Sequence, residues 1–181
     1  MKAYRKIISG IAVTAVMLTS TCTRIRQDGS MVIQMTDAPD PVYTEVNIDV
    51  RSMEVHYNDQ RQGNAGWITL KTKAGVYDLL KLQSNVLAVL ADDDAMPLGK
   101  VTQVRMVLGD QNTIESGGVV YPLNVASASQ TGIKVNVDAE IHLDKTTGIV
   151  LDFDAKKSIV LDGNGSFSLK PVIEVKSITQ F

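Results

Sequence analysis

The chain has 181 residues, of which 18 are basic and 20 acidic, and it contains one cysteine. A formal charge of −2 provides no basic face of the kind that nucleic acid requires, so we expect no nucleic-acid partner. The length suits one domain with one hydrophobic core, and a single cysteine cannot close an intramolecular disulfide.

Residues 1–21 have the layout of a secretory signal peptide. Three basic side chains lie in the first six residues, and an uncharged apolar run from Ile7 to Leu18 follows. That run is shorter than the roughly 20 apolar residues that cross a bilayer. The sequence Leu-Thr-Ser-Thr-Cys that ends at Cys22 resembles a bacterial lipobox. We therefore predict lipidation at Cys22, with ordinary cleavage and a free thiol as the alternative.

Cleavage before Cys22 leaves residues 22–30 as the lipidated cysteine and a polar tether. The mature chain then has 15 basic and 20 acidic residues, a formal charge of −5. A lipid anchor makes the membrane a partner of the protein without a spanning helix. We expect a location in the cell envelope, at the outer membrane on its periplasmic or surface face.

The stretch from Thr36 to Pro41, TDAPDP, separates two strand-like runs. We interpret it as a corner in which Asp37 accepts backbone N–H bonds in an Asx-type turn and Pro39 fixes φ. One alternative is a carboxylate that binds a cation or acts as a base. Another is an ion pair between Asp37 and Arg105, which would specify packing more than it adds stability.

The second strand-like run changes phase in its middle. Its apolar residues are even-numbered from Val46 to Val50 and odd-numbered from Met53 to Tyr57. A slip of one residue turns every side chain to the other face of a sheet. We therefore predict a β-bulge near Arg51-Ser52.

Trp67, Tyr43 and Tyr57 are candidates for a sugar-stacking platform, together with the tyrosines at 77 and 121. In the sequence WITL, Trp67 and Thr69 share one face of a strand, and the next apolar residues share the other. If those apolar residues face the core, Trp67 faces solvent or a partner. The alternative is that Trp67 caps the core at the end of a strand.

Alternation of apolar and polar residues predicts a single all-β domain over residues 31–181, with the clearest alternation from Ile133 to Leu143. Turn signals at short intervals favour an antiparallel β-sandwich or barrel, and we choose the sandwich. Residues 76–91 are compatible with one short helix or with two short strands. The aspartates at 92–94 read as a solvated loop or a helix end.

Asp152 and Asp154 fall on one face of a predicted strand, ~7 Å apart. That spacing overlaps the carboxylate separation of inverting glycosidases. Such carboxylates flank a sugar in a cleft and come from different elements, so we favour a solvated or ion-paired strand face. The adjacent Lys156 and Lys157 would balance the charge.

We predict no metal site and no cofactor. Two histidines and one cysteine are too few for the usual zinc site. The aspartates at 92–94 lack the ligand order of an EF-hand, and residues 162–165 read first as a hairpin turn. The sequence also contains no nucleophile elbow, P-loop or G-x-G-x-x-G motif.

An ordered set of local patterns resembles the bacterial and archaeal family called domain of unknown function 4382. The patterns are MTDAP at 35–39, VNIDVRSMEVH at 46–56, WITL at 67–70, VYDLL at 76–80, GKVTQVRMVL at 99–108, GIK at 132–134, LDFDA at 151–155 and LKP at 169–171. Met35 replaces the usual leucine, and Val101 replaces a common aromatic residue. The resemblance implies an exported, lipid-anchored β-domain, with a prealbumin-like Greek key as our expected topology, and implies no reaction.

The expected function is therefore a non-catalytic binding, adhesion or assembly-accessory domain, with a glycan or an envelope protein as its ligand. A small hydrolase acting on an envelope polysaccharide is the alternative of a different class. A purely structural subunit with a protein partner is the third possibility.

Overall fold

Strand β1 (Asp28–Thr36) shows how the alternation in the sequence becomes structure in the computed structural model, which describes residues 28–38, 43–59, 63–125 and 131–181. Its inward side chains Met31, Ile33 and Met35 are fully buried, whereas the residues between them remain half-buried. β1 was expected to follow a tether that ends at residue 30. It begins at Asp28 instead, so the last three residues of the predicted tether belong to the sheet.

A four-stranded sheet surrounds β1 in the order β13 (Ile173–Gln180), β10 (Thr146–Phe153), β1 and β5 (Ala88–Pro97). β1 pairs with β10 in parallel and with β5 antiparallel. The aspartates at 92–94 lie inside β5, so the expectation of a loop or helix end there is wrong. β5 alternates between buried and exposed positions there, and Asp93 is the buried member of the three.

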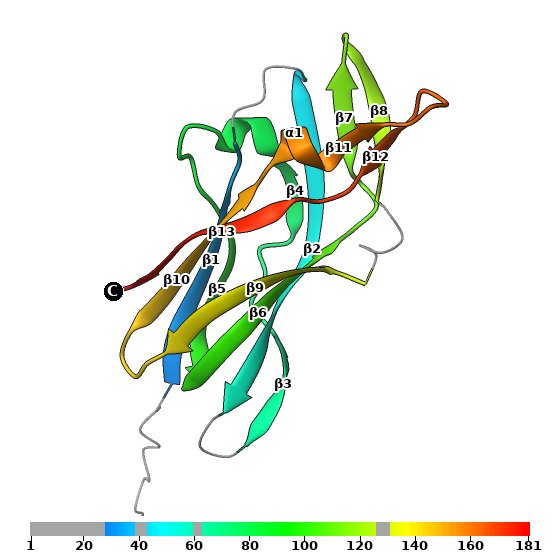
Figure 1. Cartoon of the computed structure of the whole chain (residues 1–181). Helices are drawn as coiled ribbons and strands as arrows, with labels where there is room; N and C mark the ends of the chain where they lie inside the picture. The colour runs from blue at the N-terminus through cyan, green and yellow to red at the C-terminus, as the bar shows by residue number, and fades with distance from the viewer. Residues whose placement is uncertain (1–27, 39–42, 60–62, 126–130) are drawn as a thin grey trace, which may run out of the picture.

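The second sheet has nine strands, in the order β11-β12-β8-β7-β2-β6-β9, with β3 and β4 also paired to β2 (Figure 1). The strand bounds are β2 (Glu45–Asp59), β3 (Asn64–Thr69), β4 (Gly75–Asp78), β6 (Gly99–Leu108), β7 (Thr113–Ser116), β8 (Val119–Val125), β9 (Ile133–Ile141), β11 (Ile159–Leu161) and β12 (Phe167–Leu169). All pairs in this sheet are antiparallel except β8 with β12.

The 15-residue strand β2 organises this sheet because its two halves have different neighbours. Its first half pairs with β7 on one edge and with β4 on the other. Its second half pairs with β6 and β3 on the corresponding edges. The register with β6 shifts between Val50 and Ser52, which confirms the predicted bulge. Beside this bulge the neighbours of β2 change, from β7 and β4 to β6 and β3, and we call this point the fork of the sheet.

Two short helical turns interrupt the strands. The 3₁₀ turn η1 (Leu79–Leu82) lies between β4 and β5, so the ambiguous segment 76–91 contains a strand, a turn of helix and the start of another strand. A single turn of helix, α1 (Ala155–Ser158), follows β10. Its position was predicted as the continuation of a strand.

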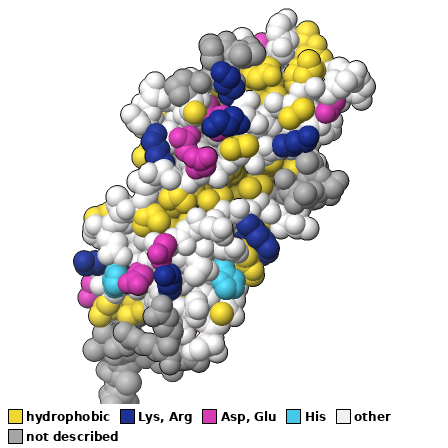
Figure 2. Space-filling model, viewed as in Figure 1, with side chains coloured by type: hydrophobic (Ala, Val, Ile, Leu, Met, Phe, Trp, Pro, Cys, Tyr) yellow, Lys and Arg dark blue, Asp and Glu magenta, His cyan; other side chains and the backbone are white. Residues whose placement is uncertain are grey.

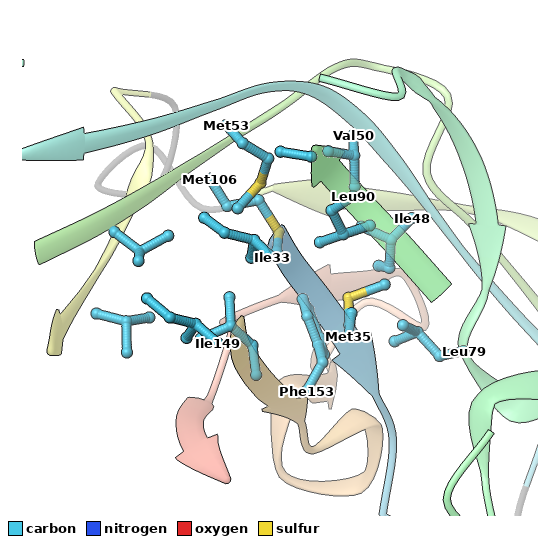
Figure 3. Packing of buried hydrophobic residues seen from close by; sticks show 14 of the residues in the cluster. Ile33, Met35, Ile48, Val50, Met53, Leu79, Leu90, Met106, Ile149 and Phe153 are labelled. Carbon is cyan, nitrogen blue, oxygen red and sulfur yellow. The ribbon is translucent and has the colours of Figure 1, made fainter. Parts of the chain in front are cut away.

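The core lies between the two sheets (Figure 3). Ile33, Ile149 and Phe153 come from the four-stranded sheet and face Met53 and Met106 of the other sheet. All five side chains are at most 1% exposed. The all-β fold of packed sheets is thus confirmed, whereas the parallel pairs of β1 with β10 and of β8 with β12 depart from the purely antiparallel arrangement that we expected.

Candidate functional site

One polar surface combines an aromatic ring with several nitrogen-bearing side chains, on the outer side of strands β3, β2, β6 and β9. The sheet register sets these side chains in two rows across the four strands. Residues next to them in sequence, such as Met53 and Val104, face the core and are buried. We call this surface the Trp67 face, and its rows are Thr69, Glu54, Arg105, Lys134 and Trp67, His56, Gln103, Asn136.

Trp67 lies half-buried on this face, which is the first of the two readings that the sequence left open for it. The guanidinium carbon of Arg105 lies 4.1 Å from the centroid of the indole ring, a cation–π distance. The imidazole of His56 meets the indole edge to face at 5.3 Å, and the ammonium of Lys134 lies 5.6 Å from the ring centroid. The indole is therefore held in place by its neighbours while part of it remains accessible.

Arg105 is fixed by Glu54 and does not pair with Asp37, so the alternative of an Asp37–Arg105 ion pair is wrong. Its Nε donates to Glu54 Oε2 at 2.7 Å, and its Nη2 contacts the same oxygen. The register explains the difference, because Glu54 and Arg105 are direct cross-strand partners on the outer face. Asp37 follows β1 in the other sheet.

The two tyrosines that were grouped with Trp67 lie elsewhere, so the prediction of one aromatic platform is wrong. Tyr57 is 8% exposed, and its hydroxyl donates to the carbonyl of Leu98 at 2.7 Å. Tyr43 packs edge to face on Phe167 of β12, 6.3 Å between centroids. The bulge in β2 moves the buried positions from the even-numbered to the odd-numbered residues. Tyr57 therefore points toward the core.

Asp37 is a structural acceptor at the corner after β1. It is 3% exposed, and its Oδ1 accepts the backbone N–H of Ala155 at 3.0 Å, at the start of α1. Its Oδ2 lies 3.5 Å from the Gln83 amide nitrogen, just after η1. The corner reading of the motif is supported, although these partners are 118 and 46 residues away rather than in a local turn. Pro39 lies outside the described residues.

Burial raises the pKa of Asp37 from 3.8 to about 6. The hydrogen bonds from Ala155 and Gln83 oppose this rise in pKa, and the nearby charges of Asp152 and Asp154 add to it. Asp152 Oδ1 is itself buried and has no hydrogen-bond partner among the described residues. A proton on Asp37 therefore relieves the repulsion among three carboxylates that the fold brings near one another.

Asp154 does not share a strand face with Asp152, because β10 ends at Phe153. Asp154 is the N-cap of α1: its Oδ1 accepts the backbone N–H of Lys157 at 2.9 Å, and its Oδ2 pairs with the Lys157 ammonium at 2.7 Å. Burial alone would raise the pKa of Asp154, but its bonds with Lys157 lower it overall. The predicted ion pairing is confirmed for Lys157, in a helix cap instead of on a strand.

Sequence reasoning missed the polar cluster at the fork of the large sheet. Asp49 is 3% exposed; its backbone N–H donates to Asn112 Oδ1 at 2.9 Å, and its Oδ2 accepts the N–H of Gln111 at 3.2 Å. Arg51, the extra residue of the bulge, pairs with Asp49 Oδ2 at 2.9 Å. The predicted bulge was the feature of the sequence that could have indicated this cluster, because a bulge often changes the direction of a side chain where strand pairing is interrupted.

A hollow of about 350 Å³ opens at the fork, and we call it the fork hollow. Asp110 is the one carboxylate among the described residues that line it, and it is paired with Arg51. A hydrolase cleft would need converging carboxylates, which this lining does not supply. The lining residues are Leu108, Gly109, Asp110, Asn112, Leu123, Asn124 and Val125.

Within the described ranges, no group of three or more histidine, cysteine, aspartate or glutamate side chains could hold a metal ion. Asp93 in β5 accepts the backbone N–H groups of Lys71 and Ala95. Asp162 accepts the hydroxyls of Ser166 and Ser168 in the turn between β11 and β12. Among the same residues, no helix has the length and apolar character needed to cross a membrane.

A family model matches residues 28–171, from the start of the first strand of the fold to two residues before the last strand begins. The matched family is described as a domain of unknown function, DUF4382. The chain belongs to the DUF4382 family. The match confirms the resemblance seen in the sequence and covers most of both sheets. No curated protein and no solved structure matches the chain.

Three of the quoted motifs lie at the end of the fold that contains the Asp37 corner. The motif MTDAP supplies the end of β1 and the Asp37 corner, and LDFDA supplies the end of β10 and the cap of α1. The motif VYDLL supplies β4 and η1, where Asp78 accepts the N–H of Leu80. These three motifs therefore hold one end of the fold together, whereas the quoted motifs WITL, GKVTQVRMVL and GIK contain Trp67, Arg105 and Lys134 of the Trp67 face. Cys22 lies outside the described residues.

Proposed function

We propose that this DUF4382 protein is an exported, lipid-anchored cell-envelope domain that binds a glycan without catalysing a reaction. The leader pattern that ends at Cys22 supports export and lipidation. The observation that carries the binding role is the half-exposed Trp67, stacked with Arg105 on a polar face. Aromatic rings beside amide and charged side chains provide both the apolar contact and the hydrogen bonds that a sugar requires.

Structural roles for the carboxylates support a binding function over a hydrolase. Asp37 accepts the N–H of Ala155, Asp154 caps α1, and Asp49 accepts the N–H of Gln111. A general acid and a base need to reach a substrate from opposite sides of a cleft. These three carboxylates instead hold the backbone of the fold.

A thermal-shift screen against envelope and host glycans tests the binding role. A ligand that binds only the folded protein raises its melting temperature by mass action. We expect a shift with at least one glycan, and its loss in Trp67→Ala. Because Trp67→Ala removes packing with Arg105, Trp67→Phe serves as a second variant, and Tyr121→Phe at the other end of the sheet serves as the control. A shift that both Trp67 variants retain would contradict binding at this face.

Lipidation is tested separately in the producing bacterium. We expect the wild-type protein in the membrane fraction, with a mature N-terminus at a lipid-modified Cys22 by mass spectrometry. Cys22→Ser should release the protein to the soluble fraction. An unmodified Cys22 on the mature protein would contradict the anchor and would leave the binding proposal intact.

A structural role with a protein partner is the second candidate, and exposed apolar side chains favour it. Val119 and Val120 at the turn between β7 and β8 are 50% and 61% exposed, and Leu161 of β11 is 63% exposed. Apolar side chains are visible at this upper end of the molecule (Figure 2). If Val120→Lys abolishes a cross-link formed in intact cells and leaves glycan shifts unchanged, the protein-partnered role is supported.

A further inference from the structure

Lys134 is an exposed cation that the fold leaves without a carboxylate partner among the described residues. Lys81, Lys100 and Lys157 each lie within 3.1 Å of an aspartate oxygen, and Lys134 differs from the other lysines without such a partner in lying beside Trp67. The cross-strand partner of Lys134 is Arg105, a second cation. Like charges directly opposite one another in a sheet repel, but Glu54 neutralises Arg105, so the charge left for an anion is that of Lys134.

The one carboxylate on the Trp67 face is already used. Both Nε and Nη2 of Arg105 contact the same oxygen of Glu54, whose side chain is 16% exposed. The ammonium of Lys134 lies near the indole, whereas the imidazole of His56 is already joined to the Thr102 hydroxyl at 3.0 Å. Lys134 is therefore the cation of the Trp67 face that no described carboxylate neutralises, on a chain whose formal charge is negative.

We propose, on the basis of the glycan-binding function above, that the ligand of the Trp67 face is an acidic polysaccharide. Its carboxylate or sulfate groups pair with Lys134, and its sugar rings contact the accessible part of Trp67. The side-chain amides of Gln103 and Asn136, joined at 2.9 Å in the next row, offer their remaining hydrogen-bonding groups to sugar hydroxyls.

A membrane surface of anionic lipid would also present negative charge, but the face lacks the apolar side chains that insert into a bilayer. The exposed large apolar side chains of the described residues lie elsewhere, at Val76, Val86, Leu87, Val119, Val120, Leu143, Leu161, Ile178 and Phe181. Interfacial binding requires an apolar surface together with cations. The polar rows of the Trp67 face therefore fit a hydrated polysaccharide better.

Trp67 is the only tryptophan in the sequence, so its fluorescence reports on this face directly. The test titrates the full chain, carrying Cys22→Ser so that no lipid anchor contributes, with three probes. These are an oligogalacturonate, a neutral malto-oligosaccharide of equal length, and phosphatidylglycerol vesicles. Lys134→Gln is compared with Lys145→Gln, a control in the turn between β9 and β10.

We expect the oligogalacturonate alone to change the emission, with an affinity that falls as salt is added. Lys134→Gln should weaken binding about fivefold, as expected for one exposed ion pair, and Lys145→Gln should leave it unchanged. Equal affinity for neutral and acidic oligosaccharides, insensitive to Lys134→Gln, would overturn the acidic ligand and keep the glycan function. A response to vesicles alone would overturn it in favour of a membrane surface. No response to any probe would overturn both this inference and glycan binding at this face.

Discussion

Asp37 illustrates how much of a residue's role its sequence context reveals. Its place between two strand-like runs predicted a backbone acceptor at a corner, and the structure shows an acceptor of the Ala155 N–H. The partner was not predictable, because Ala155 is brought close by the parallel pairing of β1 with β10. Alternation predicts which residues form a strand, but it carries no information about which strand pairs with which.

The raised pKa of Asp37 has a definite consequence for stability. A carboxyl whose pKa is higher in the folded state binds its proton more tightly there, so it stabilises the fold below pH 3.8 and loses this contribution as pH rises through about 6. At roughly 1.4 kcal/mol per pKa unit, the loss amounts to at most about 3 kcal/mol.

Asp37→Asn tests this contribution, because asparagine keeps an oxygen for the Ala155 N–H and does not ionise. We expect the variant to gain stability relative to the wild type as pH rises from 3.8 to above 6. The free energy of unfolding in urea, measured at several pH values for both proteins, gives this difference. If the unfolding free energies of the two proteins changed in parallel with pH, ionisation of Asp37 would not destabilise the fold, and the prediction would be wrong.

Asp154 provides the second prediction at this scale. Asp154→Ala removes the acceptor of the Lys157 N–H and should cost about 1 kcal/mol of unfolding free energy. Asp154→Asn retains an oxygen for the cap and removes the ion pair with the Lys157 ammonium, so it should cost clearly less. Urea unfolding at neutral pH compares the three proteins. Equal costs for both variants would mean that charge, and not capping, is what matters at this position.

At the scale of elements, β2 was predictable in detail and its neighbours were not. The phase change between Val50 and Met53 located the bulge, since only an inserted residue lets both halves bury their apolar side chains. The fork followed from a loop at residues 109–112, whose polar residues bond Asp49. The sequence showed a turn signal there but not the strand that it would contact. The short helix α1 was missed because its first residue, Ala155, continues the alternation of β10.

The fork gives a matched pair of glycine substitutions. A Cβ on Gly109 would lie 2.1 Å from Asp49 Oδ2 and 2.2 Å from Arg51 Nε, whereas a Cβ on Gly163 would meet nothing within 4 Å. Gly109→Ala must displace the buried Asp49 carboxylate from the Gln111 N–H, and we expect a loss of about 1–3 kcal/mol of unfolding free energy. Gly163→Ala should change stability by less than about 0.5 kcal/mol. A Gly109→Ala protein as stable as Gly163→Ala would show that the cluster at the fork adjusts without cost.

At the scale of the whole molecule, the Asp37 corner and the proposed ligand surface lie in different places. The Asp37 corner joins β1, η1 and α1, and the Trp67 face covers the outer side of β3, β2, β6 and β9. The sequence predicted the all-β fold and left Trp67 open between a surface position and a core cap, and it did not indicate Arg105, Lys134 and His56 as its neighbours. Those residues lie on three other strands, so only the register of the sheet brings them to the indole.

The most direct measurement is a map of amide and indole N–H chemical shifts in isotopically labelled protein, recorded as an acidic oligosaccharide is added. We predict the largest changes at the Trp67 indole and at Gln103, Lys134 and Asn136, with the fork hollow unaffected. Changes centred on Asp110 and Asn124 would place the ligand in the fork hollow instead and would contradict the assignment of the Trp67 face as the binding surface.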